Sequence, residues 1–119
     1  MSQGAPNDRR RIPPAADLHV HTRYSDGLDT VPDLLERADA WFSLISICDH
    51  DTITAYEDVP ADRLTGEVRP GRASVLPGIE ISCRIDDLRE IHLLGYFPSG
   101  FTPRFRAWAD QLAKSRRER

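Results

Sequence analysis

The stretch Ser43-Leu44-Ile45-Ser46-Ile47-Cys48 is almost continuously apolar, and Asp49-His50-Asp51 follows it directly. Such a run is typical of a strand in a parallel sheet that is covered on both faces. A shorter strand is predicted upstream, over residues 16–20, and an amphipathic helix lies between the two strands. Strand, helix and strand together form a βαβ unit, which predicts the α/β fold class.

The helix between these strands has its start signals in Asp29-Thr30-Val31-Pro32. Thr30 can cap the helix with its hydroxyl group, and Pro32 suits the first turn because its missing N–H is not needed there. Apolar residues then recur at three- and four-residue spacing, which predicts a face that packs on the sheet. That face consists of Leu34, Leu35, Ala38 and Trp41.

The second half of the chain predicts a loop, a hairpin and another helix. Residues 60–72 contain two prolines and two glycines, which favour an irregular loop. Residues 75–85 and 90–96 predict the two strands of a hairpin. Residues 102–119 predict a helix with Phe105, Trp108, Ala109 and Leu112 on one side.

Length and composition describe one globular domain over residues 16–119, preceded by a disordered arm over residues 1–15 that is rich in Pro, Arg and small polar residues. No apolar run approaches the roughly 20 residues needed to cross a bilayer, which excludes a membrane-spanning protein. No apolar segment follows the early arginines, so a signal peptide is not expected and a cytoplasmic location is predicted. The net charge of -3 argues against general nucleic-acid binding.

All four histidines lie at or beside the end of a short apolar run and next to carboxylates. His19 and His21 are two residues apart in a predicted strand, so both imidazoles project from the same face and can converge on one metal ion. His50 comes after another apolar run, and His92 stands beside the apolar residues of a further one, in Glu90-Ile91-His92. The pattern therefore predicts metal ligands at the ends of several strands.

Two carboxylates extend this set. Asp26 lies in the turn-like stretch Tyr24-Ser25-Asp26-Gly27, which can present it to the same space. Glu80 is a lone acid in an apolar strand, and its burial would be costly unless a cation or hydrogen bonds compensated it.

Taken in order, residues 17–22, 25–27, 49–52, 77–82 and 92–97 resemble the motifs of the PHP family, the polymerase and histidinol phosphatase domain. The resemblance implies the N-terminal half of a distorted β/α barrel. It also implies up to three metal ions at the C-terminal ends of the strands, which hydrolyse phosphoesters.

The resemblance implies a role for each candidate ligand. One metal would be bound by His19 and His21, and Glu80 would bridge it to a second metal that His92 also binds. A third metal would be held by Asp26 and His50. The family's remaining histidine and Asp-x-His pair have no counterpart, since no histidine follows His92. A complete barrel of this kind needs roughly 200 residues or more, so the chain is expected to be a truncated domain.

Several imidazoles with bridging carboxylates suit Zn²⁺, Mn²⁺ or Fe²⁺, whereas Mg²⁺ and Ca²⁺ prefer oxygen ligands. No catalytic group beyond the metal ligands is expected. The remaining acids of the motifs, Asp17, Asp49 and Asp51, are predicted to orient imidazoles or to cap loops rather than to bind metal.

The leading functional hypothesis is a metal-dependent phosphoesterase that acts on a small phosphorylated metabolite or a nucleotide. One alternative is a non-catalytic remnant or metal-binding half-domain, which would self-associate or require a complementing C-terminal half. Another alternative is a polymerase-associated nuclease, which would need a basic groove and a longer chain.

Overall fold

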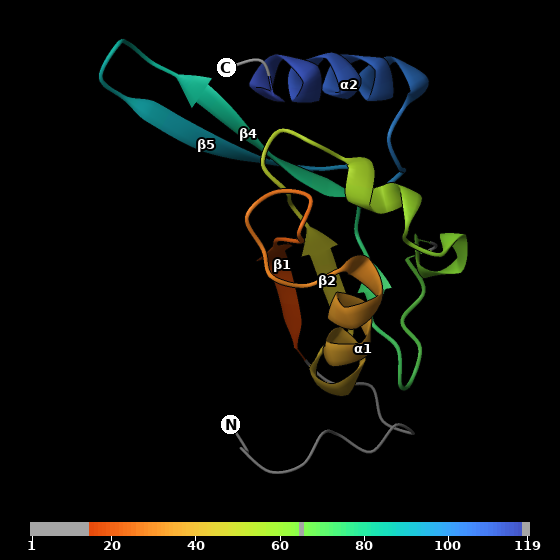
Figure 1. Ribbon diagram of the computed structural model, residues 1–119. Coiled ribbons are helices and arrows are strands. Elements are labelled where there is room, and N and C mark those ends of the chain that lie inside the picture. The colour runs from red at the N-terminus through yellow and green to blue at the C-terminus, as the bar shows by residue number, and fades with distance from the viewer. Residues whose placement is uncertain (1–14, 65, 118–119) are drawn as a thin grey trace.

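The computed structural model describes residues 15–64 and 66–117 (Figure 1). The predicted arm over residues 1–15 lies outside this part of the chain except for Ala15. The helices and strands, in chain order, are β1 (Ala16–Val20), α1 (Val31–Trp41), β2 (Leu44–Ile47), two short 3₁₀ helices (Thr54–Glu57 and Ala61–Leu64), β3 (Ser74–Val75), β4 (Gly78–Arg84), β5 (Glu90–Tyr96) and α2 (Pro103–Arg117).

The predicted βαβ unit is present. Strands β1 and β2 pair in parallel, and α1 connects them and packs against them. The helix begins as expected, because the Thr30 hydroxyl oxygen accepts a hydrogen bond from the Asp33 N–H at 3.3 Å. In the described part of the chain the parallel sheet has the strand order β1-β2-β3.

The prediction of a single strand over residues 75–85 is wrong, because the structure has parts of two strands there, β3 and β4. Val75 ends β3, which pairs in parallel with β2, whereas β4 begins at Gly78 and forms an antiparallel hairpin with β5. Pro77 lies at the division, and proline has no N–H with which to continue a ladder of hydrogen bonds. The break lets one segment contribute to two sheets.

The hydrophobic core lies between α1, the parallel sheet and the first 3₁₀ helix, and it includes Leu35, Ile45, Ile47 and Tyr56. The predicted core position of Trp41 is wrong, since this residue is 37% exposed. Val31 is buried instead, because the buried stripe of α1 starts one turn earlier than predicted.

Helix α2 packs on the core through a narrower face than the sequence predicts. Ala109 is buried and Phe105 packs against the core cluster, but Trp108 is 47% exposed. The helix lies beside the β4–β5 hairpin, which extends beyond the parallel sheet (Figure 1). Neither α1 nor α2, the α-helices within residues 15–64 and 66–117, has the length and apolar character needed to span a membrane.

The observed architecture is a small mixed α/β domain with a parallel sheet. The described residues form that sheet and a separate two-stranded hairpin, which do not by themselves close a barrel. The half-barrel implied by the family resemblance therefore stays a prediction.

The predicted irregular loop contains a buried ion pair that the sequence did not indicate. Arg63 donates to both carboxylate oxygens of Asp39, at 2.6 and 2.9 Å, and also to the carbonyl oxygen of Ala73. The N–H of Ala73 donates to Asp39 in turn. Both charged side chains are largely buried, so this network ties the loop to α1 and to the start of β3.

Replacing Asp39 with asparagine is expected to lower the free energy of unfolding by about 3 kcal/mol at pH 7, because it leaves the Arg63 guanidinium buried without its counter-charge. Burial acts to raise the pKa of Asp39, but the Arg63 hydrogen bonds outweigh it and lower the pKa. Because the pKa of Asp39 is lower in the folded state, its ionised carboxylate stabilises the fold at pH values above the unfolded-state pKa of about 3.9. This stabilisation is lost as the pH falls through the folded-state pKa. Urea unfolding at pH 7 and pH 3.5 should therefore show a difference between variant and parent that narrows in acid.

The matched control is Asp62→Asn, since Asp62 pairs with Arg72 on the surface and that pair should contribute under about 1 kcal/mol. An equal, small effect of both substitutions would show that the Asp39 network does not stabilise the fold.

Candidate metal centre

The candidate ligands lie on β1, β4 and β5, shortly after β1 and β2, and in one loop. His19 lies on β1, and His21 follows it directly. His50 follows β2 and forms an isolated parallel bridge with Glu80 of β4, in which the Asp51 N–H donates to the Glu80 carbonyl oxygen at 2.9 Å. This bridge brings the ends of the parallel strands to the hairpin.

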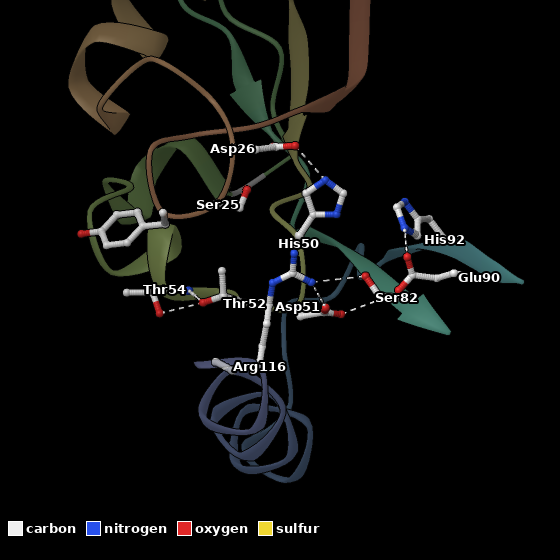
Figure 2. Close-up of a pocket in the computed structure, with 12 residues that line it drawn as sticks. Ser25, Asp26, His50, Asp51, Thr52, Thr54, Ser82, Glu90, His92 and Arg116 are labelled. Atoms are coloured by element: carbon white, nitrogen blue, oxygen red, sulfur yellow. Dashed lines mark hydrogen bonds and ion pairs between the residues drawn. The ribbon is translucent and has the colours of Figure 1, made fainter. Parts of the chain in front are cut away.

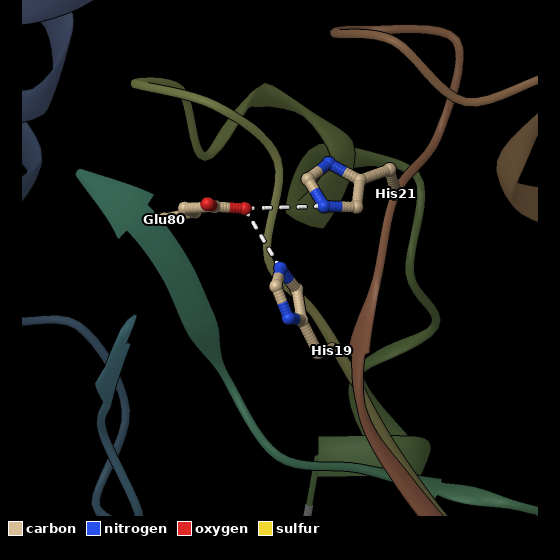
Figure 3. A group of neighbouring side chains, drawn as sticks. All are labelled: His19, His21 and Glu80. Carbon is tan, nitrogen blue, oxygen red and sulfur yellow. Dashed lines mark hydrogen bonds and ion pairs between the residues drawn. The ribbon is translucent and has the colours of Figure 1, made fainter. Parts of the chain in front are cut away.

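Glu80 lies at the centre of the cluster and is 5% exposed. Its Oε1 atom lies 2.7 Å from Nε2 of His19, 3.2 Å from Nε2 of His21 and 3.8 Å from Nδ1 of His50. Its Oε2 atom lies 2.8 Å from Nδ1 of His92. Figure 3 shows His19, on β1, and His21, just after it, pointing at Glu80 of β4. All four imidazoles of the chain therefore surround one carboxylate.

Asp26 joins two of these histidines from the loop after β1. Its Oδ1 atom lies 2.9 Å from Nδ1 of His21, and its Oδ2 atom lies 3.0 Å from Nε2 of His50. Gly27 is needed for this tight loop, because a Cβ atom there would lie 2.4 Å from the carbonyl oxygen of His21. The loop thus holds Asp26 against the end of β1.

Three groups of side chains could each hold an ion, with ligand atoms within 4.8 Å of one another. A neutral imidazole has one free lone pair, so His21 and His50, which belong to two groups each, can serve one ion at a time. One consistent distribution gives His19, His21 and Glu80 to a first ion, Asp26 and His50 to a second, and Glu80 with His92 to a third. This distribution is the one that the family resemblance implies, and the assignment of ligands stays a prediction.

The residues fit a transition-metal ion. Nδ1 of His50 is buried and has no hydrogen-bond partner among the described residues, which is costly unless another group binds it. This nitrogen faces Glu80, whereas Nε2 faces Asp26, so an ion bound to Nδ1 would belong to the group of His50, Glu80 and His92. The donor set of imidazole nitrogens and carboxylate oxygens suits Zn²⁺, Mn²⁺ or Fe²⁺. A divalent ion would also neutralise the concentrated negative charge of Glu80 and Asp26.

The cluster itself controls the charge of its members. Burial acts to raise the pKa of Glu80, but the His19 hydrogen bond and the nearby His50 outweigh it and lower the pKa. The pKa of Asp26 is lowered in the same way, with burial opposed by His21 and His50. Hydrogen bonds to Glu90 and then Glu80 raise the pKa of His92. Both carboxylates are therefore anionic at neutral pH, while a proton competes with metal for His92 as the pH falls.

Asp49 organises the loop rather than an imidazole. It is 1% exposed and accepts hydrogen bonds from the backbone N–H and the hydroxyl of Thr22 and from the hydroxyl of Ser25, each at 2.7 Å. Asp17 has a smaller local role, accepting from the backbone N–H of His19 at 3.2 Å. The contacts of Asp49 are those of a loop cap, whereas Asp17 lies within β1, and the roles predicted for these acids in a metal centre stay predictions.

Asp51 has a partner that sequence reasoning missed. It has a positive φ of 57° and accepts a hydrogen bond from the Ser82 N–H at 2.8 Å. Its other oxygen accepts a short hydrogen bond from Arg116 of α2, which lies 65 residues away in sequence. No local signal links these two residues, so the contact depends on the packing of α2.

A pocket of about 710 Å³ lies beside the cluster (Figure 2). Most of its lining residues are of polar or charged types, and they include hydroxyl groups and one side of the histidine cluster. The lining residues are Tyr24, Ser25, Asp26, His50, Asp51, Thr52, Thr54, Ser82, Glu90, His92, Ala113 and Arg116.

No family model matches the chain. The chain is 38% identical over 106 residues to the 5'-3' exoribonuclease Rnm of Salmonella typhimurium. The aligned region covers 87% of this chain and 34% of the relative. It is 35% identical over 80 residues to a 5'-3' exoribonuclease of Haemophilus influenzae, covering 66% of this chain and 27% of the relative. The chain thus spans about a third or less of the length of the curated relatives it matches.

A solved structure of an amidohydrolase from Chromobacterium violaceum, with bound SO4 and no metal, superposes with a TM-score of 0.61 at 25% identity. The match covers 87% of this chain and 34% of that chain. It agrees with the PHP resemblance only at the coarse level of a hydrolase fold. The chain therefore has a mixed α/β fold that matches the amidohydrolase type.

Proposed function

We propose that this chain provides the ligands of a metal centre that hydrolyses phosphoesters, and that its substrate is a phosphodiester of RNA. The observation that carries the proposal is Glu80, whose two carboxylate oxygens face different histidines and could each contact an ion. A shared carboxylate of this kind is suited to ions a few ångströms apart, as in two-metal hydrolases.

The comparisons support the choice of substrate class. Both curated relatives are named 5'-3' exoribonucleases, which favours a phosphodiester of RNA over the small metabolite considered from the sequence. The Chromobacterium violaceum amidohydrolase holds SO4, a tetrahedral oxyanion like phosphate. The net negative charge does not oppose this proposal, because recognition would depend on the pocket and not on the whole surface.

The protein's own groups would bind and orient the substrate. When bound, divalent ions would polarise the phosphoryl group and lower the pKa of water. The hydroxyls of Thr52 and Ser82 line the pocket and can donate hydrogen bonds to phosphoryl oxygens. Ser25 is an unsuitable nucleophile, because its hydroxyl donates its proton to the buried Asp49 at 2.7 Å and not to His21, whose Nδ1 atom lies 3.4 Å away.

A second candidate function is metal binding without efficient turnover. The observation in its favour is the small number of ligands for each ion. A neutral imidazole has one free lone pair, so His21 and His50 can each bind a single ion, and two of the three ions would then be held by two side chains each. Ions held by so few ligands exchange readily, so we expect slow turnover from the 119-residue chain.

The experiment is hydrolysis of a 5'-phosphorylated oligoribonucleotide by the purified chain with added Mn²⁺ or Zn²⁺. We expect slow, metal-dependent release of nucleotide that His50→Ala reduces by at least about tenfold, because His50 is a ligand of the Asp26 group. Circular dichroism would verify that the variant is folded. Turnover that survives His50→Ala would refute the proposed site, whereas metal binding with no turnover would support the second candidate.

A further inference from the structure

The pocket beside the histidine cluster has a positively charged residue on its wall. Among the described lining residues, Arg116 is the one arginine or lysine, and it faces a pocket that also contains Asp26, Asp51 and Glu90. Figure 2 shows its side chain rising from α2 into the space between Asp51, Ser82 and His50. The charge is thus placed beside the candidate metal ligands, on a side chain that is also partly exposed to solvent.

Two contacts fix the position of the Arg116 guanidinium. Its Nη1 atom donates to Asp51 Oδ2 and lies 3.4 Å from the hydroxyl oxygen of Ser82. Asp51 is 1% exposed and is itself held by the Ser82 N–H, so the anchor is rigid. The Arg116 side chain, by contrast, is 46% exposed.

The remaining donors of Arg116 are free to meet a ligand. Within the described part of the chain, both hydrogen bonds of its guanidinium use Nη1, which leaves the Nε and Nη2 donors. A planar guanidinium with two unused donors matches the geometry of a phosphoryl group. Preorganisation by Asp51 also reduces the entropy that an arginine loses on binding.

We propose that Arg116 is a substrate-binding residue that donates to a phosphoryl oxygen in the pocket. This inference rests on the proposed phosphoesterase function, because it names the group that would hold the substrate beside the metal centre. The ligand chemistry is a phosphate oxyanion. The inference predicts phosphate binding that does not depend on metal.

Arg116 also has a structural explanation, which the experiment must separate from ligand binding. A guanidinium that neutralises a buried carboxylate can be needed for folding alone. Asp51→Asn removes the charge that requires neutralisation while keeping an acceptor for the Ser82 N–H. Combining it with Arg116→Gln therefore tests the guanidinium without leaving a buried charge.

The experiment is an NMR titration of the ¹⁵N-labelled chain with inorganic phosphate, at constant ionic strength and with a chelator present. We expect Arg116→Gln to weaken phosphate binding by about tenfold, the effect of losing a charge-assisted hydrogen bond. The Asp51→Asn variant is the reference for the double variant, and the double variant should bind phosphate about tenfold more weakly than Asp51→Asn, because the two differ only in the guanidinium. Arg104→Gln, on the exposed part of the same helix, is the matched control and should behave like the parent.

Two results would overturn the proposal: no phosphate binding by the parent, or a double variant that binds phosphate as tightly as the Asp51→Asn variant does. If Arg116→Gln does not fold, the double variant still decides the question. Because the titration involves neither metal nor hydrolysis, its outcome is independent of the proposed catalytic function. Phosphate binding without any RNA hydrolysis would count against that function and leave the role of Arg116 standing.

Discussion

Replacing Glu80 with glutamine is expected to lower the affinity of the chain for Mn²⁺ or Zn²⁺ by at least about 100-fold. Loss of a residue that only orients a metal ligand lowers metal affinity by up to about 100-fold, and loss of a ligand itself should cost at least as much. Both oxygens of Glu80 face imidazole nitrogens, so the variant disrupts two of the three candidate groups together. An amide is neutral, and it can present only one oxygen to an ion. Elemental analysis after chelation and refilling, with a competition titration, measures the effect.

The control is Glu36→Gln on the exposed face of α1, which should leave metal content unchanged. The double variant His19→Ala/His21→Ala should remove both histidines of the first group and the His21 ligand of the second, while the contact between Asp26 and His50 is retained. Equal metal content in the Glu80→Gln variant and the parent would show that the cluster does not bind metal.

Replacing Asp49 with alanine is expected to lower the free energy of unfolding by about 4 kcal/mol, since a buried polar group left without its partner costs about 1–3 kcal/mol. Two such groups would result, the N–H and the hydroxyl of the fully buried Thr22. This is a large share of the roughly 5–15 kcal/mol that stabilises a typical protein. Urea unfolding of the variant and parent at pH 7 gives the difference.

A suitable control is Asp58→Ala, because Asp58 accepts a hydrogen bond from Tyr24 on the surface and its loss should cost under about 1 kcal/mol. Unfolding of the Asp49→Ala variant at the same urea concentration as the parent would mean that water or a rearranged loop replaces all three hydrogen bonds of Asp49.

Local patterns were sufficient to predict most of the fold. The βαβ unit follows from the apolar run before Asp49 and from the cap at Thr30, because both signals lie within the elements that they define. The division at Pro77 was missed, since an apolar sequence on both sides of a proline looks continuous until the two strands pair with different partners. The exposure of Trp41 was missed because helical spacing does not fix how wide the covered face is.

The candidate site was predictable where its residues share a strand face or a strand end. His19 and His21 meet Glu80 because the isolated bridge between His50 and Glu80 places β4 against the end of the parallel sheet. The links between Arg63 and Asp39 and between Arg116 and Asp51 were not predictable, because a charged residue in a loop or at a helix end has many possible partners. Only the three-dimensional packing selects one.

Strand β5 carries both the candidate ligand His92 and several exposed apolar side chains, including Ile91, Leu93 and Leu94. If a second copy or a complementing polypeptide covers this strand, its binding and the binding of metal to His92 involve the same element. Thermodynamic linkage then requires reciprocity: any factor by which metal strengthens the association is the factor by which association strengthens metal binding. The metal affinity of the chain would in that case depend on protein concentration, so a single dissociation constant would describe it only at one dilution.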